Sequence, residues 1–134
     1  MGGPGSEPTV SQGSATCEWA HGDRFLEQEF TGMMANQPMD GVVYTGFDRY
    51  RNQYFMVTMS NMSTTPYFAS GNFDPDGKVL SLYGYMDEPM TGEIGKPVKY
   101  VTRIIDKDKY IFEIHDMVFG ENNTKVVEVT YTRR

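Results

Sequence analysis

The sequence has one cysteine, two histidines and no long apolar run among its 134 residues. The lone Cys17 excludes an intrachain disulfide, so packing and strand pairing must stabilise the fold. His21 and His115 are too few for a histidine-based metal site, and we predict no bound metal. A membrane-spanning helix needs about 20 predominantly apolar residues, and no stretch of this sequence supplies them.

Positive charge is also scarce. The formal charge is -6 at pH 7, and no run of Lys or Arg is interleaved with aromatic residues, so we expect no nucleic-acid partner. Residues 1–12 are rich in Gly, Pro and Ser and lack the basic start and apolar stretch of a secretory signal. We expect these residues to be flexible, and the chain to be cytoplasmic, or exported after removal of a leader that it does not contain.

The rest of the chain consists of short segments in which apolar and polar residues alternate. In one of them Leu26, Gln28 and Phe30 share a face while Glu27 and Glu29 share the other, a period of two that predicts a strand. Turn residues separate the segments. We predict strands over 13–21, 24–33, 41–48, 53–61, 67–73, 79–86, 97–106, 109–117 and 125–133, with a mobile loop over 87–95.

Successive hairpins predict an all-β fold, an up-and-down antiparallel β-barrel of about 8–10 strands forming a single domain over residues 13–134. Alternation assigns one set of side chains to the interior and a second to the outer surface. The predicted interior set is Leu26, Phe30, Val42, Tyr44, Tyr54, Met56, Phe73, Leu82, Ile104, Phe112, Ile114, Val127, Val129 and Tyr131. The predicted outer set is Glu27, Glu29, Arg103, Glu113, His115 and Glu128.

Eight segments in order along the chain carry a family resemblance. They are Gly22-Asp23-Arg24-Phe25-Leu26, Phe30-Thr31-Gly32, Gly46-Phe47-Asp48, Asn61-Met62-Ser63-Thr64, Gly71-Asn72-Phe73-Asp74, Asp87-Glu88-Pro89-Met90-Thr91-Gly92, Val101-Thr102-Arg103-Ile104 and Glu128-Val129-Thr130-Tyr131-Thr132-Arg133. With these segments the chain resembles a bacterial family known as domain of unknown function 1579. The resemblance implies a calycin-like or lipocalin-like barrel, a fold that commonly holds a small apolar ligand, and no settled activity.

The sequence departs from the family pattern at two places. Relatives have a Trp-x-Asp step where this chain has Thr58-Met59-Ser60, and they begin with an extra strand that this chain lacks. The chain is therefore a fragment, or its barrel closes with one strand fewer, or a partner covers an open edge and makes a homodimer.

The predicted ligand site is the barrel lumen, where polar tips among apolar walls would orient a small apolar molecule. The alternative is an interior filled by side chains. The predicted pocket residues are Gln28, Tyr44, Tyr54, Met56, Thr58, Phe112 and Tyr131.

Noncatalytic binding of a small apolar ligand is thus the function that the sequence favours, and no cofactor is identified. One alternative is an enzyme of small-molecule metabolism that uses Glu or His for acid–base catalysis, and another is a homo-oligomeric assembly module. A haem-binding barrel with His21 or His115 as axial ligand is a minority hypothesis. Cys17 is expected to be a structural thiol, because its nearest histidine lies about 13 Å away along a strand.

Overall fold

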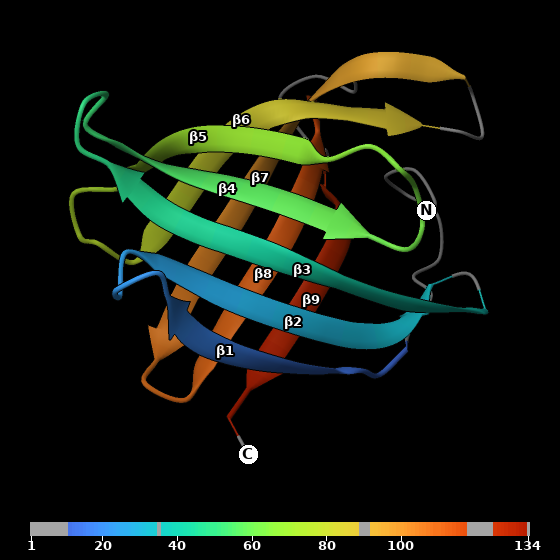
Figure 1. The fold of residues 1–134 in the computed structure, drawn as a ribbon, viewed down its shortest axis with the longest axis horizontal. Coiled ribbons are helices and arrows are strands. Elements are labelled where there is room, and N and C mark those ends of the chain that lie inside the picture. The colour runs from blue at the N-terminus through green and yellow to red at the C-terminus, as the bar shows by residue number, and fades with distance from the viewer. Residues whose placement is uncertain (1–10, 35, 89–91, 118–124, 134) are drawn as a thin grey trace. The chain divides into compact units, whose positions relative to one another are not determined.

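The computed structural model of the chain describes residues 11–34, 36–88, 92–117 and 125–133 and contains no α-helix in that part (Figure 1). It is all-β, with nine strands that run up and down in antiparallel order, as the sequence predicts. The strands are β1 (Ser14–Ala20), β2 (Phe25–Met34), β3 (Gln37–Asp48), β4 (Gln53–Ser60), β5 (Tyr67–Phe73), β6 (Val79–Glu88), β7 (Glu93–Asp106), β8 (Lys109–Asp116) and β9 (Lys125–Thr132).

Most strand bounds lie within a residue or two of the prediction, but β3 and β7 begin four residues early. The sequence suggests a turn over 34–38 and a mobile loop over 87–95, because both segments contain Pro or Gly. The strands instead extend into both segments from either side, with Gln37 opposite Met34 and Glu93 opposite Glu88. The backbone N–H of Gly95 also donates to Asp87 Oδ1 over 3.0 Å, which ties the arms of the β6–β7 hairpin together. Residues 89–91 of the predicted loop lie outside the described residues.

The turn after β5 has the chemistry that its sequence indicates. Asp74 Oδ1 accepts hydrogen bonds from the backbone N–H of Lys78 and Val79, and Gly77 has a positive φ of 71°. Such a φ is easy for glycine and strained for other residues. These N–H donors hold the pKa of Asp74 below its ordinary value. The hairpin between β5 and β6 is therefore fixed by local sequence.

The chain divides into two compact units. The N-terminal unit extends to Phe68 and contains β1–β4, and the C-terminal unit begins at Ala69 and contains β6–β9, so that the boundary falls inside β5. Residues 1–10 of the predicted flexible segment lie outside the described residues, while the Ser11 hydroxyl donates to the Met33 carbonyl over 3.0 Å. Barrel closure and a single domain over 13–134 stay predictions.

In the N-terminal unit the register pairs even residues of β2 with odd residues of β3, and odd residues of β3 with even residues of β4. One face of this sheet, called the Gln28 face, carries Leu26, Gln28, Phe30, Val43, Thr45, Tyr54, Met56 and Thr58. The opposite face, called the Glu29 face, carries Glu27, Glu29, Val42, Tyr44, Val57 and Met59. The prediction that Val42 and Tyr44 share a face with Leu26 and Phe30 is wrong, because β3 has the opposite parity.

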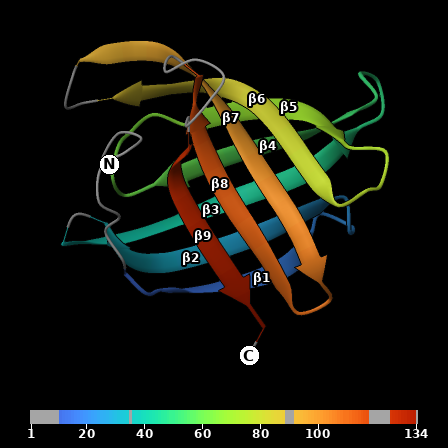
Figure 2. The same ribbon diagram turned by 180° about the vertical axis from the view of Figure 1, so that it is seen from behind.

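The C-terminal unit shows its strands β6–β9 side by side in Figure 2, with the alternation that the sequence predicts. Its apolar face carries all eight of the residues assigned to the interior in this part of the chain: Phe73, Leu82, Ile104, Phe112, Ile114, Val127, Val129 and Tyr131. The other face, called the Glu113 face, carries Val101, Arg103, Glu113, His115 and Glu128. The buried apolar side chains of this face are Ala69, Leu80, Leu82, Val98 and Tyr100.

The prediction that Glu113 faces water is wrong. Its relative exposure is 6% although Glu29 and Glu128 are exposed. Alternation assigns a side chain to a face of the sheet, but it does not say how well the neighbours on that face cover it. Glu113 lies beside Val101, which is 1% exposed, and is covered by the long side chains around it.

Candidate functional site

Four of the predicted pocket residues come together on the Gln28 face of the N-terminal unit. Gln28, Val43 and Thr58 form one cross-strand row. The buried Met56 lies two residues from Thr58 along β4, on the same face. The Thr58 hydroxyl donates to the Val42 carbonyl over 3.2 Å, and its methyl group remains available for packing. This face therefore combines half-buried polar tips with apolar side chains, as a ligand-binding wall requires.

Tyr44 does not join these residues. It lies directly opposite Glu27 on the Glu29 face. Burial raises the pKa of Tyr44, and the charge of Glu27, its hydrogen bond with the hydroxyl, and the charge of Glu29 raise the pKa further. The tyrosine hydroxyl is therefore a hydrogen-bond donor to a carboxylate.

The remaining two predicted pocket residues belong to the C-terminal unit. The Phe112 ring stacks on that of Tyr100 with centroids 6.1 Å apart, and Tyr131 stacks on Tyr110 with centroids 4.6 Å apart. Both pairs lie on the apolar face, where stacked rings add about 0.5–1.5 kcal/mol beyond their burial. Their evident role is packing within this unit, and a ligand role for Phe112 and Tyr131 stays a prediction.

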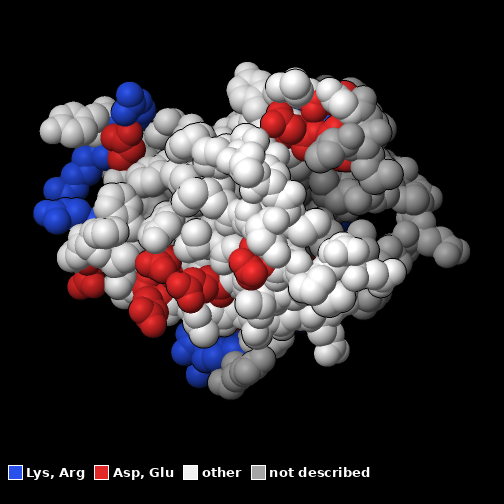
Figure 3. All heavy atoms as spheres, turned by 45° about the vertical axis from the view of Figure 1, so that its right-hand side comes forward, with Lys and Arg blue, Asp and Glu red and all other residues white. Residues whose placement is uncertain are grey.

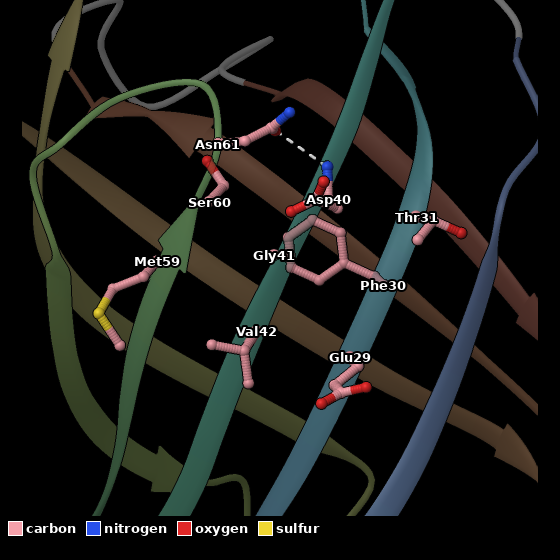
Figure 4. Close-up of a pocket in the computed structure, with 9 residues that line it drawn as sticks. All are labelled: Glu29, Phe30, Thr31, Asp40, Gly41, Val42, Met59, Ser60 and Asn61. Atoms are coloured by element: carbon pink, nitrogen blue, oxygen red, sulfur yellow. Dashed lines mark hydrogen bonds between the residues drawn. The ribbon is translucent and has the colours of Figure 1, made fainter.

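The N-terminal unit has an open hollow of about 500 Å³ at one end of β2, β3 and β4 (Figure 4). Three neighbouring cross-strand rows line it, and they combine apolar with hydrogen-bonding side chains. The rows are Glu29, Val42 and Met59, then Phe30, Gly41 and Ser60, then Thr31 and Asp40 with Asn61.

Gly41 lets a ring of the neighbouring strand approach β3 beside this hollow. A Cβ atom at this position would meet the Phe30 ring at 2.5 Å and the Met59 carbonyl oxygen at 2.6 Å. Glycine within a strand often marks such a close approach. The missing side chain lets the Phe30 ring lie against β3 on the Gln28 face, while the side chains of Val42 and Met59 belong to the Glu29 face of the same rows.

Hydrogen bonds with Asn61 close one end of the hollow. The backbone N–H of Asp40 donates to Asn61 Oδ1 over 2.9 Å, and the N–H of Asn61 donates to the Asp40 carbonyl over 2.9 Å. Asn61 Nδ2 also donates to the Pro38 carbonyl over 3.2 Å. The Asn61 side chain thereby continues the β3–β4 ladder beyond the last strand residue, and fixes the Asp40 backbone at the rim.

The walls of the hollow are acidic. Glu29 and Asp40 contribute carboxylates, and Glu29 also lines a second, much smaller hollow with Thr16, Glu18 and Glu27. Asp and Glu side chains likewise gather in patches on the surface seen in Figure 3. A carboxylate only accepts hydrogen bonds when it is ionised. These walls thus suit a ligand with an apolar body and a hydrogen-bond donor or positive charge.

Sequence reasoning missed this hollow. The signal that it overlooked is Gly41 in the middle of a run that otherwise alternates, between Asp40 and Val42. Its meaning depends on which ring of a neighbouring strand lies over the glycine, and that requires the register of β2 against β3.

A second cluster lies on the Glu113 face of the C-terminal unit. Glu113 Oε1 accepts a hydrogen bond from His115 Nε2 over 2.8 Å, and Glu113 Oε2 accepts one from Arg103 Nε over 3.2 Å. Burial acts to raise the pKa of Glu113, but the bonds from His115 and Arg103 outweigh it and hold the pKa below its ordinary value. Glu113 is therefore an anion that orients the His115 ring.

An ion pair lies at one end of the apolar face of the same unit. Lys96 Nζ is 2.6 Å from Asp116 Oδ2 and 3.6 Å from Glu93 Oε1, and the Lys96 and Asp116 side chains are 11% and 6% exposed. The hydrogen bond with Asp116 raises the pKa of Lys96 despite its desolvation. Lys96 thus compensates the buried charge of Asp116 among apolar neighbours.

The described residues contain no group of three or more His, Cys, Asp or Glu side chains arranged for a metal ion. His21 packs edge-on against Phe25 with centroids 5.9 Å apart, and the Nε2 atom of His115 is engaged by Glu113. An axial bond from that atom to haem would cost this hydrogen bond. None of the described residues forms a helix that is long and apolar enough to cross a membrane.

The fold defines a class of all-β proteins built from consecutive antiparallel strands. A family model described as "Protein of unknown function (DUF1579)" matches residues 1–133. The chain belongs to this family, which confirms the resemblance seen in the sequence. No curated protein and no solved structure matches the chain.

Proposed function

We propose that the chain binds a small, mostly apolar molecule without catalysis, and that the hollow of the N-terminal unit holds it. The observation that carries this proposal is the hollow itself, in which the apolar side chains of Val42 and Met59 lie opposite each other on neighbouring strands. Its volume of about 500 Å³ falls within the usual range of small-molecule sites. Val42 and Met59 would contact the body of the ligand.

The polar rim narrows the class of ligand. Glu29 and Asp40 accept hydrogen bonds, and the chain has a formal charge of -6. An anionic head group would be repelled by these carboxylates, whereas a hydroxyl, amide or amine group would donate to them. The proposed ligand is thus an apolar molecule with at least one donor group, neutral or positively charged.

The binding test begins with a thermal-shift screen of apolar alcohols, apolar amines, terpenoid-like compounds, fatty acids, flavins and haem. Calorimetry then gives the dissociation constant of any compound that raises the melting temperature. For the proposed ligand we expect Met59→Ala to weaken binding about tenfold, because truncation removes roughly 1.4 kcal/mol of apolar contact.

Met56→Ala is the matched control, because Met56 and Met59 lie on opposite faces of the same strand. Binding weakened by Met56→Ala alone would assign the ligand to the Gln28 face and contradict the hollow. A screen in which no compound shifts the melting temperature would remove ligand binding as the function.

A second function is supported by the contact between Glu113 and His115. A buried carboxylate that holds a histidine ring by a hydrogen bond is the arrangement that orients a general base in many active sites. We propose proton abstraction from a small substrate as this alternative activity. In a screen of enolisable carbonyl compounds and esters, we expect any turnover to fall at least about 100-fold in His115→Gln. Turnover that His115→Gln leaves unchanged would reject this assignment.

A further inference from the structure

Strand β1 is the outer strand of the N-terminal sheet. Among the described residues its hydrogen-bonded neighbour is β2 alone, over seven consecutive residue pairs without a register shift (Figures 1 and 2). The backbone N–H and C=O groups on the far side of such a strand are a template for another strand. Only a chain in extended conformation satisfies them in full.

The side chains of β1 give this edge little protection. Proteins block exposed edges with charged side chains, above all lysine, and with proline, bulges or a covering segment. Ser14–Ala20 contains no Lys, no Pro and no bulge, and its one charged residue is Glu18. Thr16, Cys17, Glu18 and Trp19 are exposed, and the Trp19 side chain is 64% exposed. An exposed tryptophan beside an unprotected edge is typical of an interaction surface.

We propose that a second copy of this chain pairs with β1, antiparallel about a two-fold axis at Cys17. In this register all seven residues of β1 are paired. Cys17 lies opposite Cys17 of the second copy, Thr16 opposite Glu18, Ala15 opposite Trp19, and Ser14 opposite Ala20.

Side-chain chemistry favours this register over its neighbours. Backbone groups point to the edge at every second residue, so the nearest alternatives move the axis by one residue to Thr16 or Glu18. Each alternative pairs only five of the seven β1 residues, and the axis at Glu18 places two carboxylates directly opposite each other, which is destabilising. With the axis at Cys17, Glu18 faces a threonine hydroxyl and the bulky Trp19 faces the small Ala15.

The dimer brings carboxylates of the two copies close together, so salt, which screens their repulsion, should strengthen the association. Glu18 already lies opposite Glu27 within one copy, and the two-fold axis brings a second such pair close to it. Added salt screens this repulsion, which is the reverse of its effect on an interface made of ion pairs. Burial raises the pKa of the Cys17 thiol, so the thiol stays protonated and the association is noncovalent unless an oxidant is added.

Sedimentation velocity of the full chain tests the association. We expect a monomer–dimer equilibrium that shifts toward dimer by about threefold or more between 50 mM and 500 mM NaCl. Cys17→Lys places two ammonium groups opposite each other and should abolish the dimer. Thr130→Lys, an exposed position on β9, is the matched control and should leave the dimer intact. A monomer at all salt concentrations up to about 1 mM protein would overturn the proposal.

Disulfide trapping tests the register. A mild oxidant should cross-link the unaltered chain through Cys17. In the Cys17→Ser background, Thr16→Cys and Glu18→Cys should each cross-link at least about tenfold less with themselves than with each other in an equimolar mixture. Self-linking of either variant above the mixed product would place the axis elsewhere and overturn the register. None of these readouts depends on ligand binding, so the proposed function and the proposed dimer succeed or fail separately.

Discussion

Both units contain glutamates that lie directly opposite each other on neighbouring strands, and one such pair from each unit shows a difference in how the charges are compensated. In the C-terminal unit Glu113 lies opposite Glu128, and in the N-terminal unit Glu18 lies opposite Glu27. Arg103 and His115 contact Glu113, while Lys125 Nζ lies 2.7 Å from Glu128 Oε1. Neither Glu18 nor Glu27 makes an ion pair within the described residues.

This difference separates a region built for stability from one that keeps uncompensated charge. Like charges directly opposite each other destabilise a sheet unless cations lie between them. The C-terminal unit supplies the cations and also pairs Asp116 with Lys96 on its apolar face. The N-terminal unit has carboxylates without such cations beside the hollow at Gly41 and along the edge of β1, the two places where we propose that a ligand and a second copy bind. Residues that are poorly placed for stability often serve binding.

Removal of Lys96 should have the largest effect on the stable region. Lys96→Met leaves the Asp116 carboxylate without its closest cation at a site where it is 6% exposed. We expect the free energy of unfolding to fall by about 2–3 kcal/mol, between the effects known for exposed and for fully buried pairs. Urea denaturation at pH 7 measures it.

The double variant Lys96→Met with Asp116→Leu is the control for this prediction. Replacing both charges by apolar groups removes the unpaired carboxylate, so stability should recover to within about 1 kcal/mol of the unaltered chain. A double variant as unstable as the single one would show that Lys96 contributes through its packing and not through its charge.

The second largest loss of stability is expected at the opposed pair Glu113 and Glu128 of the C-terminal unit. Glu113→Gln removes the acceptor that holds Arg103 and His115, and we expect a loss of about 1–2 kcal/mol at pH 7. Glu128→Gln, which breaks only an exposed pair with Lys125, should cost less than about 0.5 kcal/mol.

The stability that Glu113→Gln loses should become smaller as the pH falls. The pKa of Glu113 is lower in the folded chain than in the unfolded chain, where it is about 4.3. The stability that it contributes is fully present above pH 4.3 and disappears as the pH falls through the lower, folded value. The gap in stability between the unaltered chain and Glu113→Gln should therefore narrow as the pH falls below about 4.3 and through the folded pKa. A gap that widens on acidification would contradict the assigned pairing.

The sequence predicts much of the fold because strand alternation is local. Turn residues such as Asp74 and Gly77 mark hairpins whose geometry depends on a few neighbours, and the fold class and most strand bounds follow from them. All eight interior assignments in the C-terminal unit share one face for the same reason.

The candidate site depends on register between strands, which alternation within a strand does not contain. Alternation alone predicts the wrong face for Tyr44, because nothing in β3 says whether its even or its odd residues share a face with the even residues of β2. Gly41 likewise acquires its meaning only when Phe30 lies opposite it. The burial of Glu113 depends on side chains from β7 and β8 together. Each of these features joins residues far apart in the chain.

The smallest effect should also have the opposite sign, and it tests the comparison most directly. Glu18→Gln removes one charge from the opposed pair in the N-terminal unit, where no cation offsets it. We expect the free energy of unfolding to rise by about 0.5 kcal/mol at low salt, although the same substitution at Glu113 lowers it. Near 1 M NaCl, where charges are screened within about 3 Å, the gain should vanish. A gain that persists in high salt would have another origin than charge repulsion, and a loss would mean that Glu18 is compensated after all, which would remove the contrast between the two units.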